Sequence, residues 1–85
     1  MTDEKVALIT GAGQGIGEAI AKRLHNDGFR VALVGRTLAK VERVAKEINA
    51  DGGEAFAIAA DVSKREEVFA AVDEATKHFG DFNVI

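Results

Sequence analysis

Apolar residues form four short runs along the chain, at residues 6–9, 31–34, 55–60 and 82–85. Runs of this length are typical of strands that are buried on both faces of a parallel sheet. Between the runs, apolar residues recur every three or four positions, which is the spacing of one face of an α-helix. The pattern therefore predicts four strands alternating with three helices.

The first predicted helix follows a glycine-rich turn. Its apolar face is predicted from Ile16, Ile20 and Leu24, which recur at a spacing of four. Gly28 is placed to end the helix, because glycine readily adopts the left-handed conformation that follows a helix. His25 lies in the last turn, where a cation suits the helix dipole, so we expect it to cap the helix rather than to bind a metal.

Polar residues mark the starts of the two later helices. Thr37 is expected to cap the second helix, and Ser63 with Glu66 matches a capping box at the start of the third. His78, in the last turn of the third helix, is expected to be structural. The second helix also carries a run of charges, which we expect to form a solvated face with local ion pairs: Lys40, Glu42, Arg43, Lys46 and Glu47.

Short connections between alternating strands and helices predict an α/β fold with a parallel sheet. In the spatial order 3-2-1-4, right-handed crossovers place the first two helices on one face of the sheet and the third on the other. The strand order then reverses beside residues 10–17, where open α/β sheets bind their ligands. The expected fold class is a Rossmann-like doubly wound parallel sheet. Because residues 82–85 look like a strand that is just beginning, we expect residues 1–85 to be the N-terminal part of a single domain.

The composition is that of an ordinary globular domain, with 47% hydrophobic and 29% charged residues. A net charge of −3 without a basic cluster argues against nucleic-acid binding. The apolar runs are far shorter than a membrane span, and residues 1–5 do not resemble a signal peptide. Without cysteine the chain has no disulfide and no thiolate metal site, so we expect a cytoplasmic protein without a metal.

Residues 10–17, Thr-Gly-Ala-Gly-Gln-Gly-Ile-Gly, join the first strand to the first helix. Glycine is needed where the backbone takes a positive φ or where a ligand approaches the main chain, and a helix N-terminus attracts phosphate. The stretch therefore predicts a phosphate-binding turn, with a tight ligand-free connection as the alternative. Its spacing is Gly11-x-x-x-Gly15-x-Gly17, and Ile16 stands where the pattern Gly-x-Gly-x-x-Gly would need glycine. A P-loop is excluded, since no Gly-Lys-Ser/Thr follows.

Two motifs together resemble the short-chain dehydrogenase/reductase family: residues 10–17, and Ala-Asp-Val-Ser at 60–63 after the third strand. The resemblance extends along the whole chain and covers the nucleotide-binding half of such enzymes. Within the family, residues 13–17, 27–29 and 68–72 are most similar to acetoin (diacetyl) reductases, also called butanediol dehydrogenases. The resemblance implies hydride transfer between NAD(P) and a small ketone or alcohol, acetoin- or diacetyl-like or 3-oxoacyl-like, by a homo-oligomeric enzyme.

The resemblance also implies roles for the residues of the glycine turn. Gly11 allows the turn itself, and Gly15 and Gly17 permit close approach of phosphate and of the first strand. Gln14 and the N–H of Ile16 face the ribose and the pyrophosphate. All five residues are therefore expected to bind the cofactor.

Asp61 and Val62, after the third strand, are expected to contact the adenine. The resemblance implies that the Asp61 carboxylate accepts a hydrogen bond from the adenine amino group, with the Val62 backbone beside it. A carboxylate at the carboxyl end of a strand next to the switch point also suits an N–H donor on chemical grounds. The alternative is that Asp61 caps the following helix, for which Ser63 is better placed.

The end of the second strand bears on the choice of cofactor. An acidic residue about twenty positions after the glycine turn binds the ribose hydroxyls of NAD, but Gly35 occupies that position here. Gly35 leaves space for a 2′-phosphate, and Arg36 can form a charge-assisted fork with it. We therefore predict that NADP is preferred and that NAD remains possible. Acetoin reductases usually carry Asp at this position, and the alternative interpretation of Arg36 is a solvated residue before a helix cap.

No residue of this chain is expected to be catalytic. By the resemblance, the family's Asn-Ala-Gly segment would begin just past Ile85, its serine and Tyr-x-x-x-Lys pair would follow much later, and the chain has no tyrosine. A second interpretation is a Rossmann-like module that senses a nucleotide without catalysis, and a flavodoxin-like or methyltransferase fold is a third. A downstream serine and Tyr-x-x-x-Lys would favour an enzyme that acts on a small-molecule carbonyl substrate.

Overall fold

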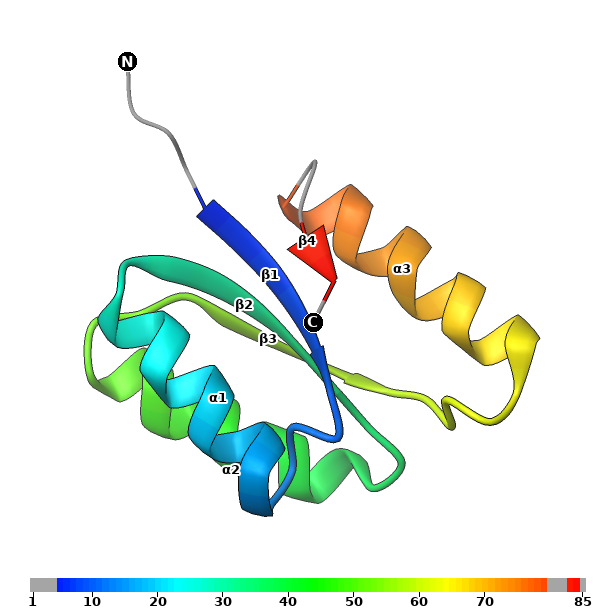
Figure 1. Ribbon diagram of the computed structural model, residues 1–85, viewed down its shortest axis with the longest axis horizontal. Coiled ribbons are helices and arrows are strands. Elements are labelled where there is room, and N and C mark those ends of the chain that lie inside the picture. Colours follow the sequence, from blue (N-terminus) through cyan, green and yellow to red (C-terminus); the bar gives the residue numbers. More distant parts are fainter. Residues whose placement is uncertain (1–4, 80–82, 85) are drawn as a thin grey trace.

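Four parallel strands form one sheet in the computed structural model, which describes residues 5–79 and 83–84 (Figure 1). The elements follow one another as β1 (Lys5–Thr10), α1 (Gly15–Asn26), β2 (Phe29–Gly35), α2 (Leu38–Ala50), β3 (Ala55–Ala59), α3 (Arg65–Phe79) and β4 (Asn83–Val84). The strand order is β3-β2-β1-β4, and each neighbouring pair is parallel. The predicted alternation is confirmed, and the strand order is the order 3-2-1-4 that the sequence analysis considered. Residues 82 and 85 of the last predicted strand lie outside the described residues.

The two faces of the sheet pack against different helices (Figure 1). Ala7 and Ile9 of β1 belong to a buried cluster with Ile48 of α2 and with residues of α1. Leu8 points to the opposite face, because side chains alternate along a strand, and it clusters with Ala75 of α3. Burial of a side chain as large as that of Ile9 stabilises the fold by about 1.5–3 kcal/mol. Helices α1 and α2 therefore cover one face and α3 the other, as predicted.

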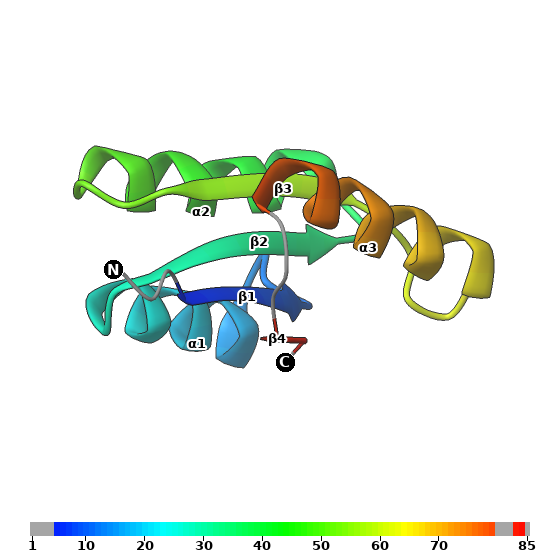
Figure 2. The ribbon, with the colours of Figure 1, turned by 90° about the horizontal axis from the view of Figure 1, so that it is seen from above.

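The strands run in the same direction, so their carboxyl ends lie at one edge of the sheet (Figure 2). In the register, Thr10 of β1 is opposite Val34 of β2, and Gly35 is opposite Ala59 of β3. The loops that follow β1, β2 and β3 therefore leave the sheet side by side. This edge is where a ligand of an open α/β sheet is expected.

Helix α1 packs against the core through two of the three residues predicted for its apolar face, but not through the first. Ala21 is buried, whereas Ile16 is 79% exposed, so the assignment of Ile16 to the apolar face is wrong. Gly17 lies against the backbone of the glycine turn, and Ile16 lies about 100° around the helix from Gly17. Ile20 and Leu24 are partly buried and pack against the core.

The two histidines hold structural positions. His25 Nε2 lies 2.9 Å from Oδ2 of Asp51, in the turn after α2, so this ring connects two helices instead of capping its own. The ring of His78 stacks on that of Phe56, with centroids 4.2 Å apart. Gly28 follows α1 as predicted, with a φ of 94° and its N–H donating to the His25 carbonyl.

Within residues 5–79 and 83–84, no group of three or more His, Cys, Asp or Glu residues is arranged to hold a metal ion. No helix within this part of the chain has both the length and the apolar character needed to cross a membrane.

Candidate functional site

The connection between β1 and α1 is shaped by three glycines in different environments. Gly11 and Gly15 have positive φ values of 64° and 60°, which favour glycine, and a Cβ on either would meet no atom within 4 Å. A Cβ on Gly17 would instead overlap the carbonyl oxygen of Gly11. Gly11 and Gly15 therefore keep the outer side of the turn open, whereas Gly17 allows α1 to lie close to the turn.

Helix α1 presents its N-terminus at this turn. Gln14 is the N-cap residue, but its side chain makes no capping hydrogen bond. Its Oε1 atom instead accepts a hydrogen bond from Nζ of Lys40 at 2.9 Å. The first N–H groups of a helix, that of Ile16 among them, have no acceptor within the helix. This end of α1 therefore offers donors and a positive dipole to an anion.

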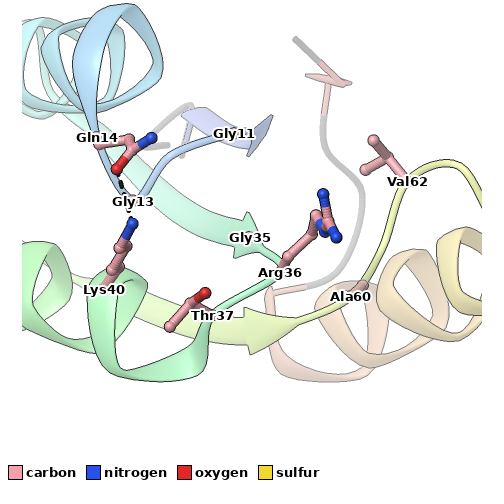
Figure 3. Close-up of a pocket in the computed structure, with 9 residues that line it drawn as sticks. All are labelled: Gly11, Gly13, Gln14, Gly35, Arg36, Thr37, Lys40, Ala60 and Val62. Carbon is pink, nitrogen blue, oxygen red and sulfur yellow. Dashed lines mark hydrogen bonds between the residues drawn. The ribbon is translucent and has the colours of Figure 1, made fainter.

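An open pocket of about 460 Å³ lies where the loops after β1, β2 and β3 meet (Figure 3). Five of the predicted site residues line it: Gly11, Gln14, Gly35, Arg36 and Val62. Four residues that the sequence alone did not assign to the site complete the lining: Gly13, Thr37, Lys40 and Ala60. The remaining predicted residues lie outside the lining, at the start of α1 and after β3: Gly15, Ile16, Gly17 and Asp61.

Gly35 has a packing reason to be glycine. A Cβ at this position would lie 2.7 Å from Cγ1 of Val41, a buried residue of α2. The absence of a side chain therefore allows α2 to pack close to the end of β2. Thr37 is the N-cap residue of α2, as predicted, but its side chain makes no capping hydrogen bond and lines the pocket instead.

Arg36 and Asp61 follow β2 and β3 and lie near each other. Nε of Arg36 is 3.9 Å from Oδ2 of Asp61, and the Arg36 side chain is 80% exposed. In Figure 3 the guanidinium of Arg36 points from the end of β2 into the space beside Val62. An exposed pair at this separation contributes little to stability, so the guanidinium remains available to an anionic ligand.

The Asp61 carboxylate also organises the turn before α3. Its Oδ1 atom accepts hydrogen bonds from the N–H of Ser63 at 3.0 Å and from the hydroxyl of Ser63 at 2.7 Å. These two bonds, with smaller contributions from the charges of Arg36 and Lys64, lower the pKa of Asp61 below its ordinary value. The carboxylate is therefore ionised at neutral pH, and its Oδ2 atom faces Arg36.

The predicted capping box of Ser63 and Glu66 is wrong. Ser63 bonds to Asp61, and it is Glu67 whose Oε1 atom accepts a hydrogen bond from the Asp61 N–H, at 2.7 Å. The reason is that α3 begins only at Arg65, so Ser63 lies too early in the chain to be its N-cap.

Lys40 is the candidate that the sequence analysis placed elsewhere. It was expected on a solvated face, but it lines the pocket and donates its hydrogen bond to Gln14. The sequence does contain a signal for it, because Lys40 is the third residue of α2. A cation in the first turn of a helix is disfavoured by the helix dipole and therefore calls for another explanation.

Four charged side chains join α1 to α2. Nζ of Lys22 lies 2.8 Å from Glu18 and 2.6 Å from Glu47, and the guanidinium of Arg43 lies 2.8 Å from each of the same two carboxylates. Nη2 of Arg43 also donates to the Gly13 carbonyl at 3.3 Å. Hydrogen bonds from Arg43 and then Lys22 lower the pKa of Glu18 to about 2. Arg43 and Glu47 of α2 therefore belong to a network that joins α2 to α1 and reaches the glycine turn. The sequence analysis expected only local ion pairs on α2.

The chain matches the family model described as short chain dehydrogenase over residues 5–85. An uncharacterised oxidoreductase of Staphylococcus aureus (strain MRSA252) is 40% identical over 82 residues, which are 96% of this chain and 35% of the relative. The chain thus spans about a third of the length of the curated relatives it matches.

Solved structures match it equally well. An alcohol dehydrogenase from the archaeon Thermococcus sibiricus, complexed with 5-hydroxy-NADP, is 43% identical with a TM-score of 0.91, over 96% of this chain and 36% of that chain. A 3-ketoacyl-(acyl-carrier-protein) reductase from Brucella melitensis, complexed with NADH, is 52% identical with a TM-score of 0.84, over 92% of this chain and 31% of that chain. The motifs, the fold and these matches agree, and the chain belongs to the short-chain dehydrogenase family.

Proposed function

We propose that this chain is the NADP-binding part of an oxidoreductase that transfers a hydride between the nicotinamide and a small ketone or alcohol. The observation that carries the proposal is the pocket in which the glycine turn meets Arg36 and Lys40. Among the residues that line this pocket none is a carboxylate, so the lining carries two positive charges. A pyrophosphate and a 2′-phosphate are the ligand groups that such a surface suits.

The residues of the glycine turn fit such a cofactor. Gly11 and Gly15 leave the outer side of the turn free of side chains, which permits a pyrophosphate to approach the backbone. The N–H of Ile16 would donate to the pyrophosphate, and Gln14 would face the ribose. Gly17 would support the site indirectly, by allowing α1 to pack against the turn.

The residues that follow β2 and β3 fit the adenosine part of the cofactor. Arg36 would bind the 2′-phosphate, and Asp61 would accept a hydrogen bond from the adenine amino group, with the backbone of Val62 beside the ring. When bound, the nicotinamide supplies the hydride chemistry. The residues of this chain bind and orient the cofactor, and we propose none of them as catalytic.

The substrate class that we propose is a 3-oxoacyl-like or an acetoin- or diacetyl-like carbonyl compound. The similar structure named as a 3-ketoacyl-(acyl-carrier-protein) reductase supports the first. The resemblance at residues 13–17, 27–29 and 68–72 supports the second. On the same resemblance we expect the intact protein that contains this chain to be a homo-oligomer, and on the chain's composition we expect it to be cytoplasmic.

The cofactor preference tests the proposal. In the intact protein, we expect kcat/KM for NADPH to exceed that for NADH, and Arg36→Ala to reduce this ratio. One hydrogen-bonded charge contact is worth ~1.5–3 kcal/mol, or ~10- to 150-fold in affinity. Because Arg36 is largely exposed, we expect the lower end, ~10-fold.

Arg23→Ala is the matched control. Arg23 is an equally exposed arginine on α1 whose partner, Asp27, lies one turn further along the chain. This variant should leave the NADPH to NADH ratio unchanged. A wild-type protein that prefers NADH, or a ratio that Arg36→Ala does not alter, would refute the NADP assignment.

A non-catalytic nucleotide-sensing module is the second candidate, because the pocket suits a nucleotide phosphate whether or not a reaction follows. The two candidates share cofactor binding and differ in turnover. We therefore expect NADPH consumption when the intact protein is given diacetyl, acetoin or a 3-oxoacyl thioester. Tight NADPH binding without turnover of any carbonyl substrate would favour the sensor.

A further inference from the structure

Lys40 is a cation in an unfavourable electrostatic position. It is the third residue of α2, where the helix dipole disfavours positive charge. Arg43, one turn further along the helix, lies between two carboxylates. Within the described residues, Lys40 contacts no carboxylate, and its ammonium donates only to the neutral Oε1 atom of Gln14. A hydrogen bond to a neutral acceptor is weaker than one to an anion, so an anionic ligand would compete effectively for this ammonium.

The backbone of Lys40 is held close to the glycine turn. A Cβ on Gly13 would lie 2.9 Å from the Cβ of Lys40, so this glycine allows the first turn of α2 to pack against the turn after β1. Arg36 lies four residues before Lys40 and lines the same pocket (Figure 3). Two cations therefore reach one pocket, one from the end of β2 and one from the start of α2.

We propose that Lys40 is a second ligand of the 2′-phosphate of NADP and thereby a specificity-determining residue beside Arg36. This inference rests on the proposed function. A phosphate monoester carries close to two negative charges at neutral pH and three acceptor oxygens, so it accepts a guanidinium fork and an ammonium together. With NAD, Lys40 keeps its hydrogen bond to Gln14. With NADP, the ammonium exchanges this neutral acceptor for a phosphate oxygen and leaves the Gln14 amide free for the ribose.

The test compares two ligands that differ only in the 2′-phosphate. Binding of adenosine 2′,5′-bisphosphate and of 5′-AMP to the intact protein is measured by titration calorimetry, and NADP and NAD are measured in parallel. We expect Lys40→Met to weaken the two 2′-phosphorylated ligands ~10-fold and to change the other two less than twofold. Lys40→Arg should retain most of the preference. Lys46→Met removes an exposed lysine of the same helix outside the pocket. This variant should change neither the ratio of the affinities for adenosine 2′,5′-bisphosphate and 5′-AMP nor the ratio of the affinities for NADP and NAD.

Salt provides a second measurement. The affinity of the wild-type protein for adenosine 2′,5′-bisphosphate should fall with ionic strength more steeply than that of Lys40→Met, because the variant has one charge contact fewer.

The possible results separate the inference from the function on which it rests. A wild-type protein that prefers NAD, or that binds neither dinucleotide, would overturn both. A wild-type preference for NADP that Lys40→Met leaves intact would overturn the role of Lys40 alone. An equal loss for all four ligands would also overturn it, because it would indicate that Lys40 only supports Gln14 and the glycine turn.

Discussion

A Cβ on Gly35 would lie 2.7 Å from Cγ1 of Val41, so the end of β2 and the start of α2 approach each other through a glycine. Val41 is fully buried and has little room to move away. The position that distinguishes NAD from NADP in dinucleotide-binding folds is thus also a packing position in this protein. A carboxylate introduced at this position has to displace part of α2.

We expect Gly35→Asp to move the cofactor preference toward NAD and to destabilise the protein by about 1–3 kcal/mol, the usual cost of overpacking. Adding Val41→Ala should recover part of this loss, since the contact with Cγ1 is removed. Urea unfolding of the two single variants and the double variant measures the coupling between the sites. Thr37→Asp is the stability control, because it adds the same charge two residues away, at the N-cap position. If the double variant were destabilised by the sum of the two single variants' losses, the contact between residue 35 and Val41 would be contradicted.

Replacement of Gly15 and of Gly17 by alanine should have different effects on stability and on NADP affinity. Gly15→Ala places its Cβ in open space but strains a φ of 60°, so we expect ~1–2 kcal/mol of destabilisation and a clear loss of NADP affinity. Gly17→Ala forces its Cβ against the Gly11 carbonyl and should destabilise the protein more strongly. Thermal unfolding and NADP titration measure the two effects.

Gly52→Ala is the matched control for backbone strain. Gly52 has a φ of 85°, meets no atom within 4 Å of an added Cβ, and lies in the turn after α2. Its replacement should lower stability without altering NADP affinity. An equal loss of affinity in Gly52→Ala and Gly15→Ala would mean that general strain, and not the phosphate site, explains the effect.

The strands, the helices and their alternation followed from the sequence because they depend on local patterns. Buried strands such as Val31–Val34 within β2 are continuous apolar runs, and short connections with right-handed crossovers leave few ways to arrange them. The periodicity failed at Ile16 for a physical reason. A spacing of four identifies residues on one side of a helix, but it does not reveal whether the sheet lies beneath the first turn.

The side-chain partners could not be predicted, because they join segments far apart in the chain. Glu18 and Arg43 are separated by 25 residues, and Lys40 and Gln14 by 26. Their pairing depends on how α2 lies beside the glycine turn, which no local pattern specifies. The site could therefore be located from its glycines, whereas the contact of Lys40 with Gln14 could not.

The network around Glu18 should make the stability of the folded protein vary with pH in the acid range. The pKa of Glu18 is lowered from 4.5 to about 2 in the folded protein, and that of Glu47 is lowered as well. A lowered pKa adds stability above the unfolded-state value, and this contribution is lost as pH falls from about 4.5 toward 2. Urea unfolding at several pH values should therefore give a weaker pH dependence for Glu18→Gln than for the wild type. Glu42→Gln removes an exposed carboxylate of α2 that is outside the network, and this variant should retain the wild-type dependence. Parallel pH profiles for Glu18→Gln and the wild type would contradict the role of the network.

The two carboxylate oxygens of Asp61 have different partners. The role of Asp61 in the turn with Ser63 can therefore be separated from its proposed role in binding the adenine. Oδ1 accepts both hydrogen bonds from Ser63, and Oδ2 faces Arg36 at 3.9 Å. Ser63→Ala removes the hydroxyl bond alone, so we expect a loss of about 0.5–1.5 kcal/mol in stability and an unchanged NADP affinity. Asp61→Ala should lower stability and also weaken NADP.

A ligand change isolates the adenine contact. Nicotinamide hypoxanthine dinucleotide phosphate carries an oxygen where adenine carries its amino group, so it has no N–H to offer to Asp61 at that position. If the carboxylate accepts a hydrogen bond from the adenine amino group, Asp61→Ala should weaken NADP ~10-fold and leave the affinity for the hypoxanthine analogue unchanged or improved. Improvement is expected because the variant no longer sets an ionised carboxylate against a carbonyl oxygen, and the lowered pKa of Asp61 keeps that carboxylate charged in the wild type. Equal losses for both dinucleotides would mean that Asp61 acts only through the turn it forms with Ser63, and the adenine would then have to be recognised by another group.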